Sequence, residues 1–258
     1  MKAKKSYGQH FLTSEKIAEK IADSMQLPQE WKFVLEVGPG KGMLTKYLLQ
    51  RQYPLVAVEA DGDMVSYLNE HYPKLNVQFG DFLKFNFNEA FGNEPFGLIG
   101  NFPYNISSQI VFLMLEHKNQ IPEMVGMFQK EVAERIVATP NGKEYGILSI
   151  LAQAWYDAYY LFGVDKGNFS PPPKVQSAVV RLVRKKNMEL GCDEKLFKNI
   201  VKQTFNQRRK MLRNTLKQFV SDDQFLSNPM FTKRPENLSV QDFIQLTNEV
   251  DNWKKSVK

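Results

Sequence analysis

The sequence has little of what proteins use for covalent cross-links, metal binding or membrane insertion. Its 258 residues include a single cysteine, Cys192, so no intramolecular disulfide can form. With that one cysteine and three scattered histidines, the spacing predicts no transition-metal site. No apolar stretch is long enough for a signal peptide or a membrane span, so we expect a soluble, cytoplasmic protein.

What the sequence does contain is typical of a folded protein. Hydrophobic residues make up 43% and aromatic residues 12%, which is enough to build a substantial core. The net charge of +6 and the pI near 9.1 favour anionic partners moderately. Charge alone does not decide whether that partner is a nucleic acid.

Short apolar runs alternate with helical periodicity from residue 31 to about residue 184. This alternation predicts an α/β fold with a parallel sheet covered on both faces. Residues 175–183 alternate apolar and polar side chains, like a late and partly exposed strand. A helix is expected at residues 107–117, and five buried strands are expected at residues 33–37, 55–59, 77–79, 96–99 and 124–128.

The character of the chain changes after residue 184. Residues 184–191 have the composition of a linker, and only helical patterns follow. We therefore expect a catalytic domain at residues 1–188 and a small all-helical domain at residues 189–258.

A glycine-rich turn, Gly38-Pro39-Gly40-Lys41-Gly42, follows the first strand. Glycines there let the backbone approach a ligand closely. The dinucleotide spacing G-x-G-x-x-G fails, because Met43 and Thr45 stand where its last glycine would be. This argues against a nicotinamide-dependent dehydrogenase.

Two acidic residues follow the next strands. Glu59 ends the second strand about twenty residues beyond the glycine turn, where a carboxylate accepts hydrogen bonds from both ribose hydroxyls. Asp81, after the third strand, is placed to accept from an adenine amine. Ribose and adenine acceptors without a phosphate cradle suit an adenosine that carries no phosphate, and they predict S-adenosylmethionine.

Asn101-Phe102-Pro103-Tyr104 follows the fourth strand and is the most specific local motif. An adenine amine is a poor nucleophile, because its lone pair is delocalised into the ring. Acceptors at the Asn101 side chain and the Phe102 carbonyl would draw the nitrogen towards a tetrahedral shape and stabilise its growing positive charge. Pro103 fixes the backbone, and Tyr104 offers a ring for stacking on the base. The motif predicts methylation of a planar amine.

With these motifs in place, the sequence resembles the ribosomal RNA adenine dimethyltransferase family, and especially its bacterial small-subunit branch. The resemblance spans nearly the whole chain, and five motifs occur in the family's order. Three of these motifs are the glycine turn, the pair of acidic residues and the amine motif described above, each with its flanking residues. The other two motifs are Gly8-Gln9-His10-Phe11-Leu12 and Phe169-Ser170-Pro171-Pro172-Pro173-Lys174-Val175-Gln176-Ser177. His10 replaces the family's usual asparagine, and Phe102 its usual leucine.

The resemblance implies a Rossmann-like, seven-stranded class I methyltransferase sheet followed by a small helical domain. It implies that Phe169 stacks on the target base opposite Tyr104. It also implies dimethylation of the N6 amines of two adjacent adenines in the 3′-terminal hairpin of 16S rRNA, within an assembling 30S subunit. The cofactor contacts that we expect are His10, Leu12, Gly38, Gly40, Glu59, Asp81 and Asn101.

Residues 205–213 form the densest basic cluster of the chain. If this segment is one helix, Arg209 and Arg213 share a face, and we expect phosphate contacts from Arg208, Arg209, Lys210 and Arg213. Lys2, Lys4 and Lys5 would add a flexible basic arm. Since a stacked adenine cannot reach a buried methyl donor, the target must be unpaired or extruded.

Two alternatives stay open beside this interpretation. A large-subunit rRNA adenine methyltransferase of the macrolide-resistance type would share the cofactor and amine motifs. A ribosome-assembly factor without catalytic activity would share the fold, although RNA binding alone needs neither Glu59 nor the Asn101/Tyr104 pair. We expect a monomer that needs no metal.

Overall fold

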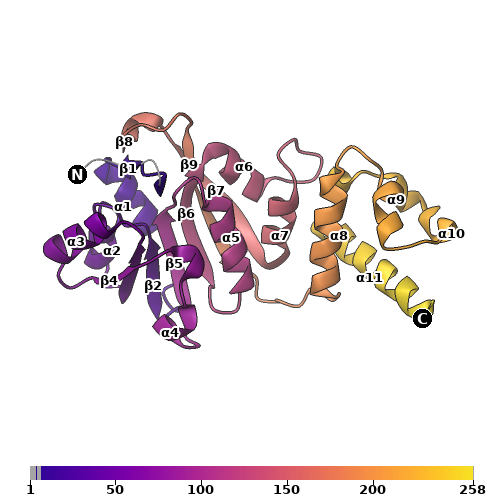
Figure 1. Ribbon diagram of the computed structural model, residues 1–258, viewed down its shortest axis with the longest axis horizontal. Coiled ribbons are helices and arrows are strands. Elements are labelled where there is room, and N and C mark those ends of the chain that lie inside the picture. Colours follow the sequence, from indigo (N-terminus) through magenta and orange to yellow (C-terminus); the bar gives the residue numbers. More distant parts are fainter. Residues whose placement is uncertain (1–3, 5–6, 258) are drawn as a thin grey trace. The chain divides into compact units, whose positions relative to one another are not determined.

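A seven-stranded sheet forms the core of the larger part of the chain (Figure 1). The structure is a computed structural model, and it describes Lys4 and residues 7–257. The strand order is β4-β3-β2-β5-β6-β9-β7. The strands are β2 (Phe33–Val37), β3 (Leu55–Glu59), β4 (Asn76–Phe79), β5 (Phe96–Asn101), β6 (Glu123–Gln129), β7 (Tyr156–Val164) and β9 (Ser177–Arg184).

The first five strands of this sheet are parallel, as the apolar runs predicted. Leu35 lies beside Val56 of β3 on one side and beside Leu98 of β5 on the other. Strand β9 runs antiparallel to β6, with Val180 opposite Gly126. The predicted seven-stranded α/β fold is confirmed, and the predicted strands at residues 33–37 and 55–59 have the bounds of β2 and β3.

The strand order of the sheet reverses between β2 and β5: strands that follow β2 are added first on one side of it and then on the other. From β2 it passes through α2 (Thr45–Gln50) to β3 and through α3 (Gly62–His71) to β4. It then returns to β5 on the other side of β2 and continues through α5 (Ser107–Glu116) to β6. Because such crossovers are right-handed, α2 and α3 cover one face and α5 the other. A ligand crevice forms at this kind of switch point, at the carboxyl ends of the strands.

Small residues in β5 and β6 let one large ring pack into the sheet. A Cβ on Gly126 would lie 2.2 Å from the Phe102 ring, and a Cβ on Gly100 would lie 2.9 Å from it. The Phe102 side chain is 1% exposed and meets Phe128 edge to face at a centroid distance of 5.2 Å. The residue after Asn101 is therefore anchored in the core, and this fixes the start of the loop that follows β5.

A two-stranded sheet lies beside the main one and joins distant parts of the sequence. Strand β1 (Phe11–Leu12) pairs antiparallel with β8 (Phe169–Ser170), and Leu12 lies opposite Phe169. It precedes α1 (Glu15–Asp23), whose Ala18, Ile21 and Ala22 are buried. The pairing brings the first family motif to the last one.

Contacts divide the chain into two compact units. The first comprises residues 1–133 and 157–184, and the second comprises residues 134–156 and 185–258. The second unit thus includes α7 (Ile147–Trp155), which the sequence analysis did not assign to it. The boundary near residue 188 stays a prediction as the limit between a catalytic and an RNA-binding domain.

The second unit is helical. Asp193 caps α8 (Glu194–Asn206) and Ser239 caps α11 (Val240–Ser256), each through its side chain. The shorter α9 (Leu212–Thr215) and α10 (Asp223–Leu226) lie between them in the sequence. In the described part of the chain, no helix is long and apolar enough to span a membrane.

Candidate active site

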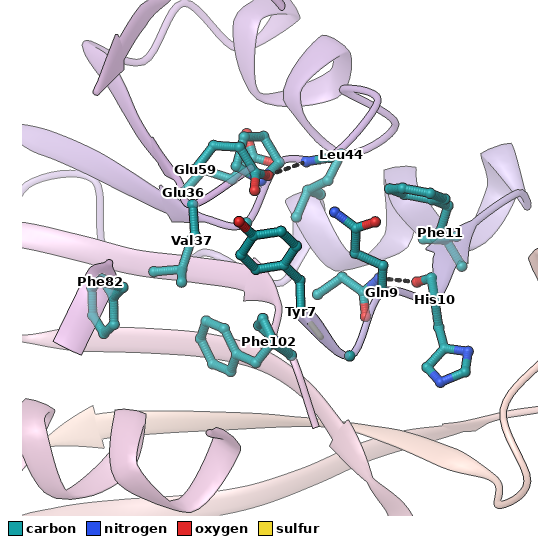
Figure 2. A pocket seen from close by; sticks show the side chains of 18 of the residues that line it. Tyr7, Gln9, His10, Phe11, Glu36, Val37, Leu44, Glu59, Phe82 and Phe102 are labelled. Carbon is teal, nitrogen blue, oxygen red and sulfur yellow. Dashed lines mark hydrogen bonds between the residues drawn. The ribbon is translucent and has the colours of Figure 1, made fainter. Parts of the chain in front are cut away.

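A cavity of about 670 Å³ opens at the carboxyl ends of β2, β3 and β5 (Figure 2). Its walls are the loops after these strands, the loop after β4, and residues 7–12, a segment that we call the strap. The volume lies in the range of cofactor pockets. The cavity brings together every residue predicted to bind the cofactor: His10, Leu12, Gly38, Gly40, Glu59, Asp81 and Asn101.

The glycine turn after β2 needs its glycines for conformation as well as for space. Gly38 and Gly40 have φ angles of +65° and +56°, which side chains rarely adopt. A Cβ on Gly40 would also lie 3.0 Å from the Phe11 ring of the strap. Any larger residue at position 40 would therefore strain the turn and push the strap away from the cavity.

Glu59 is buried at the end of β3, with 6% of its surface exposed. Its carboxylate accepts from the Gly40 amide at 3.0 Å and from the Asp61 amide at 2.9 Å. Burial raises the pKa of Glu59, while these two bonds oppose that shift. The carboxylate is thereby held beside the glycine turn, where both hydroxyls of a ribose would meet it.

Asp81 stands at the rim, at the start of the loop after β4. One carboxylate oxygen accepts from the Leu83 amide at 3.0 Å and so holds the side chain in place. The side chain is exposed yet lines the cavity. Its predicted contact with the adenine amine is compatible with this placement and stays a prediction.

Glu36, which begins the motif around the glycine turn, is a second carboxylate of the cavity wall for which no role was predicted. Glu36 is 1% exposed and accepts from the Thr45 hydroxyl at 2.7 Å. Burial raises the pKa of Glu36 to about 8, and the nearby charge of Glu59 adds to the shift. The signal was present in the sequence, since Glu36 is the one charged residue of an otherwise apolar strand.

The amine motif contributes Asn101 and Phe102 to the lining of the cavity. Asn101 ends β5, and its Nδ2 donates to the His10 carbonyl at 2.9 Å. The Phe102 amide donates to the Met127 carbonyl at 3.2 Å, which fixes the next peptide. No residue among Lys4 and 7–257 donates a hydrogen bond to Asn101 Oδ1 or to the Phe102 carbonyl oxygen. Both oxygens therefore lack a donor among the described residues, and both residues line the cavity.

Two contacts hold the side chain of Tyr104, one at its hydroxyl and one at its ring. Its hydroxyl is hydrogen-bonded to the Ser177 hydroxyl, and its ring stacks on His10 at a centroid distance of 5.4 Å. Burial raises the pKa of Tyr104, so its phenol stays neutral. The ring lines the cavity together with Pro103.

Phe169 is placed differently from its neighbours in the predicted set. It is 4% exposed, belongs to the hydrophobic core around Leu12 and Val179, and is not among the described residues that line the cavity. Stacking on a base would require its side chain to turn. The stacking role of Phe169 therefore stays a prediction.

The strap is tied to the cofactor side of the cavity by Asp61, a residue that the sequence analysis missed. The buried Asp61 carboxylate accepts from Lys4 Nζ at 2.7 Å and from Gln9 Nε2 at 2.9 Å. Burial alone would raise the pKa of Asp61, but these two bonds hold it below its usual value. Lys4 thus pairs with a carboxylate of the cofactor side, while Lys2 and Lys5 lie outside the described residues.

The basic cluster is a turn and not one helix, so that part of the prediction is wrong. Helix α8 ends at Asn206, and α9 begins only at Leu212. The buried stripe of α8 would continue at Gln207 and Arg208, where no apolar side chain is available to extend it.

Arg208 differs from its neighbours in this turn. Its guanidinium donates to the carbonyls of Lys143 at 2.9 Å and Gly142 at 3.1 Å. Arg209, Lys210 and Arg213 are exposed. The cluster therefore offers three exposed cations, and a fourth that holds the loop at residues 142–143.

The fold and the site together define an S-adenosylmethionine-dependent methyltransferase of class I. A dimethyladenosine transferase from Plasmodium falciparum has a similar structure, with a TM-score of 0.77, 28% identity, and coverage of 94% of this chain and 98% of that one. The 23S rRNA methyltransferase ErmE shares the fold, with a TM-score of 0.68, 24% identity, and coverage of 93% and 99%.

Sequence comparison narrows this class to one family. Proteins named ribosomal RNA small subunit methyltransferase A are 54% identical in Phocaeicola vulgatus and 53% identical in Flavobacterium johnsoniae. The alignments cover 97% of this chain in both cases, and 90% and 97% of those proteins. The profile described as ribosomal RNA adenine dimethylase matches residues 1–252. The chain belongs to this family of rRNA adenine dimethyltransferases.

The residues of the cavity fit the cofactor of this class. The buried Glu59 carboxylate suits the ribose hydroxyls, and the glycine turn leaves room for a ligand beside the backbone. No cluster of histidine, cysteine, aspartate or glutamate in the described part of the chain could hold a metal ion. When bound, S-adenosylmethionine supplies an electrophilic methyl group on a sulfonium.

Proposed function

We propose that this protein dimethylates the N6 amines of two adjacent adenines in the 3′-terminal hairpin of 16S rRNA, within an assembling 30S subunit. The names of the relatives that are 50–54% identical support the small subunit as the target. The observation that carries the proposed chemistry is the pair of available acceptors in the cavity, Asn101 Oδ1 and the Phe102 carbonyl.

These two acceptors match the two N–H groups of an adenine amine. Hydrogen bonds to both would hold the amine and favour a tetrahedral nitrogen, whose lone pair is then localised for attack. Both oxygens carry partial negative charge, so they stabilise the positive charge that develops on the nitrogen. The assignment of the Asn101 amide is secure, because the His10 carbonyl can only accept and must face the NH₂ group.

The remaining residues of the motif would position the base. Tyr104 offers its ring, which lines the cavity, as a stacking surface. Pro103 closes the wall beside Gly38, since a Cβ on that glycine would lie 3.8 Å from the proline ring. After the first transfer, the methylated amine loses a proton to water or buffer. Monomethyladenine keeps one N–H, so only one of the two acceptors receives a hydrogen bond in the second transfer.

We propose that the exposed cations of the basic cluster, in the turn after α8 and in α9, contact RNA phosphates. Arg209, Lys210 and Arg213 are the exposed members of the cluster. Phosphate contacts of this kind provide affinity and orientation, but they do not read the sequence. In this proposal the helical domain at residues 189–258 binds RNA and residues 1–188 carry out methyl transfer. The protein acts as a cytoplasmic monomer, which light scattering would test.

The test is methyl transfer from radiolabelled S-adenosylmethionine to undermodified 30S subunits, with 50S subunits and naked 16S rRNA as controls. We expect dimethyladenosine from the 30S sample. Label in 50S subunits alone would replace the proposed substrate by a large-subunit target. Cofactor binding without label in any sample would contradict the proposed chemistry.

A further inference from the structure

His10 makes three contacts, and all of them are on the side of the cavity where the amine is held. Its Nδ1 is 2.8 Å from the Pro171 carbonyl oxygen, and its ring is stacked on Tyr104 with an interplanar angle of 28°. Its backbone carbonyl accepts from Asn101 at 2.9 Å. Figure 2 shows the imidazole directed away from Glu59, which marks the ribose side of the cavity.

The chemistry of these contacts fixes the state of each group. A backbone carbonyl can only accept, so His10 Nδ1 carries a proton and donates it to the Pro171 carbonyl. By the same argument, the carbonyl of His10 selects the amide orientation of Asn101 that leaves Oδ1 for a ligand. One residue of the strap thus orients both the acceptor and the ring of the amine motif.

The ring contact limits where a base can stack. The Tyr104 hydroxyl is held by Ser177, and the His10 ring lies against the phenol ring at a centroid distance of 5.4 Å. No other ring among the described residues stacks on Tyr104, so we infer that a target base stacks on the face opposite His10. The hydrogen bond from His10 to the Pro171 carbonyl extends the pairing of the neighbouring residues, because Phe11 lies opposite Ser170 in the two-stranded sheet. The imidazole is thereby held against the segment that follows β8.

We propose that His10 is a positioning residue of the acceptor-base site, whose ring braces Tyr104 and directs the adenine to one face of that ring. This inference rests on the proposed function and deepens it. It differs from a cofactor contact, because it assigns the His10 side chain to the base and to the proline segment.

The proposal is tested with three substitutions at one position. His10→Phe keeps a ring beside Tyr104 but removes the donor to Pro171, whereas His10→Ala and His10→Asn remove the ring. For each variant, kcat and KM are measured with undermodified 30S subunits, or with whichever RNA the wild-type protein methylates. The Kd of S-adenosylmethionine is measured separately by calorimetry.

We expect His10→Ala and His10→Asn to lower kcat about tenfold, with the cofactor Kd changed by less than about twofold. His10→Phe should recover most of the lost kcat, which a role in folding or cofactor binding would not explain. A matched control is His71→Ala on α3, because His71 is also stacked on a tyrosine, Tyr67, at 3.9 Å. That control should keep wild-type kcat.

Two results would overturn the proposal. One is a cofactor Kd raised about tenfold in His10→Ala with kcat at saturating cofactor unchanged, since His10 would then act on the cofactor. The other is a kcat of His10→Phe as low as that of His10→Ala, since stacking would then contribute nothing. A wild-type protein that methylates 50S instead of 30S subunits would refute the proposed substrate and leave the comparison of variants intact.

Discussion

Removing the Asn101 side chain should slow methyl transfer at saturating cofactor while RNA still binds. Asn101 is the last residue of β5, and its amide is oriented by the His10 carbonyl before any substrate arrives. Loss of one such preoriented group in an active site typically lowers kcat about 100- to 1,000-fold, or about 2.7–4 kcal/mol. We expect Asn101→Ala to fall in that range.

The assay is single-turnover methyl transfer to undermodified 30S subunits at saturating cofactor. RNA affinity should stay within about threefold of wild type, because the proposed phosphate contacts do not involve Asn101. Asn101→Asp keeps an acceptor but loses the donor to His10, so it should lose less rate than Asn101→Ala. The exposed Asn88, whose side chain has no hydrogen bond among the described residues, provides the matched control Asn88→Ala. Collapse of RNA binding with an unchanged rate on bound RNA would refute the acceptor role of Asn101.

Further predictions concern the buried carboxylates and the basic turn. Between pH 4.5 and about 8, the folded protein holds a proton on Glu36 that the unfolded chain releases, so the stability of the fold should fall as pH rises. Glu36→Gln should flatten this dependence of Tm on pH. An unchanged slope would contradict the argument that burial raises the pKa of Glu36. Glu59→Gln should raise the Kd of S-adenosylmethionine about tenfold or more in calorimetry, with circular dichroism unchanged, whereas an unaltered Kd would remove the ribose role. Arg208→Ala should lower stability by about 1 kcal/mol and leave the slope of log RNA affinity against log salt concentration unchanged. Arg209→Ala should reduce the magnitude of that slope by about 1. The reverse pattern would exchange the roles of the two arginines.

The sequence predicted the sheet well because buried parallel strands are nearly continuous apolar runs. Residues 33–37 and 55–59 are of this kind, and a glycine turn or an acidic residue marks where each strand ends. Strand β7 at residues 156–164 was not predicted, because its exposed tyrosines hide the alternation of a half-buried strand. Helix α7 is buried almost all round, so it has no polar face to reveal a helical period.

The site was predictable where chemistry depends on residue type next to a strand end. Glu59, Asp81 and the Asn101 motif are such cases, and the cavity brings all of them together. Contacts between segments far apart in the sequence were out of reach. The bond from Gln9 to Asp61 spans 52 residues, and that from His10 to Pro171 spans 161. The periodicity of a sequence does not predict such long-range hydrogen bonds. Asp61, however, lies two residues after Glu59 and could have been proposed from the sequence as a further acidic residue near the cavity.

The central claim is that this protein makes two adjacent dimethyladenosines in the small-subunit rRNA. The most direct test is mass spectrometry of the 3′-terminal fragment of 16S rRNA, after undermodified 30S subunits react with the protein and S-adenosylmethionine. The account predicts two neighbouring dimethyladenosines in the hairpin with the wild-type protein, and unmodified adenines with Asn101→Ala at the same reaction time. Methyl groups on 23S rRNA instead, or equal modification by the two proteins, would contradict it.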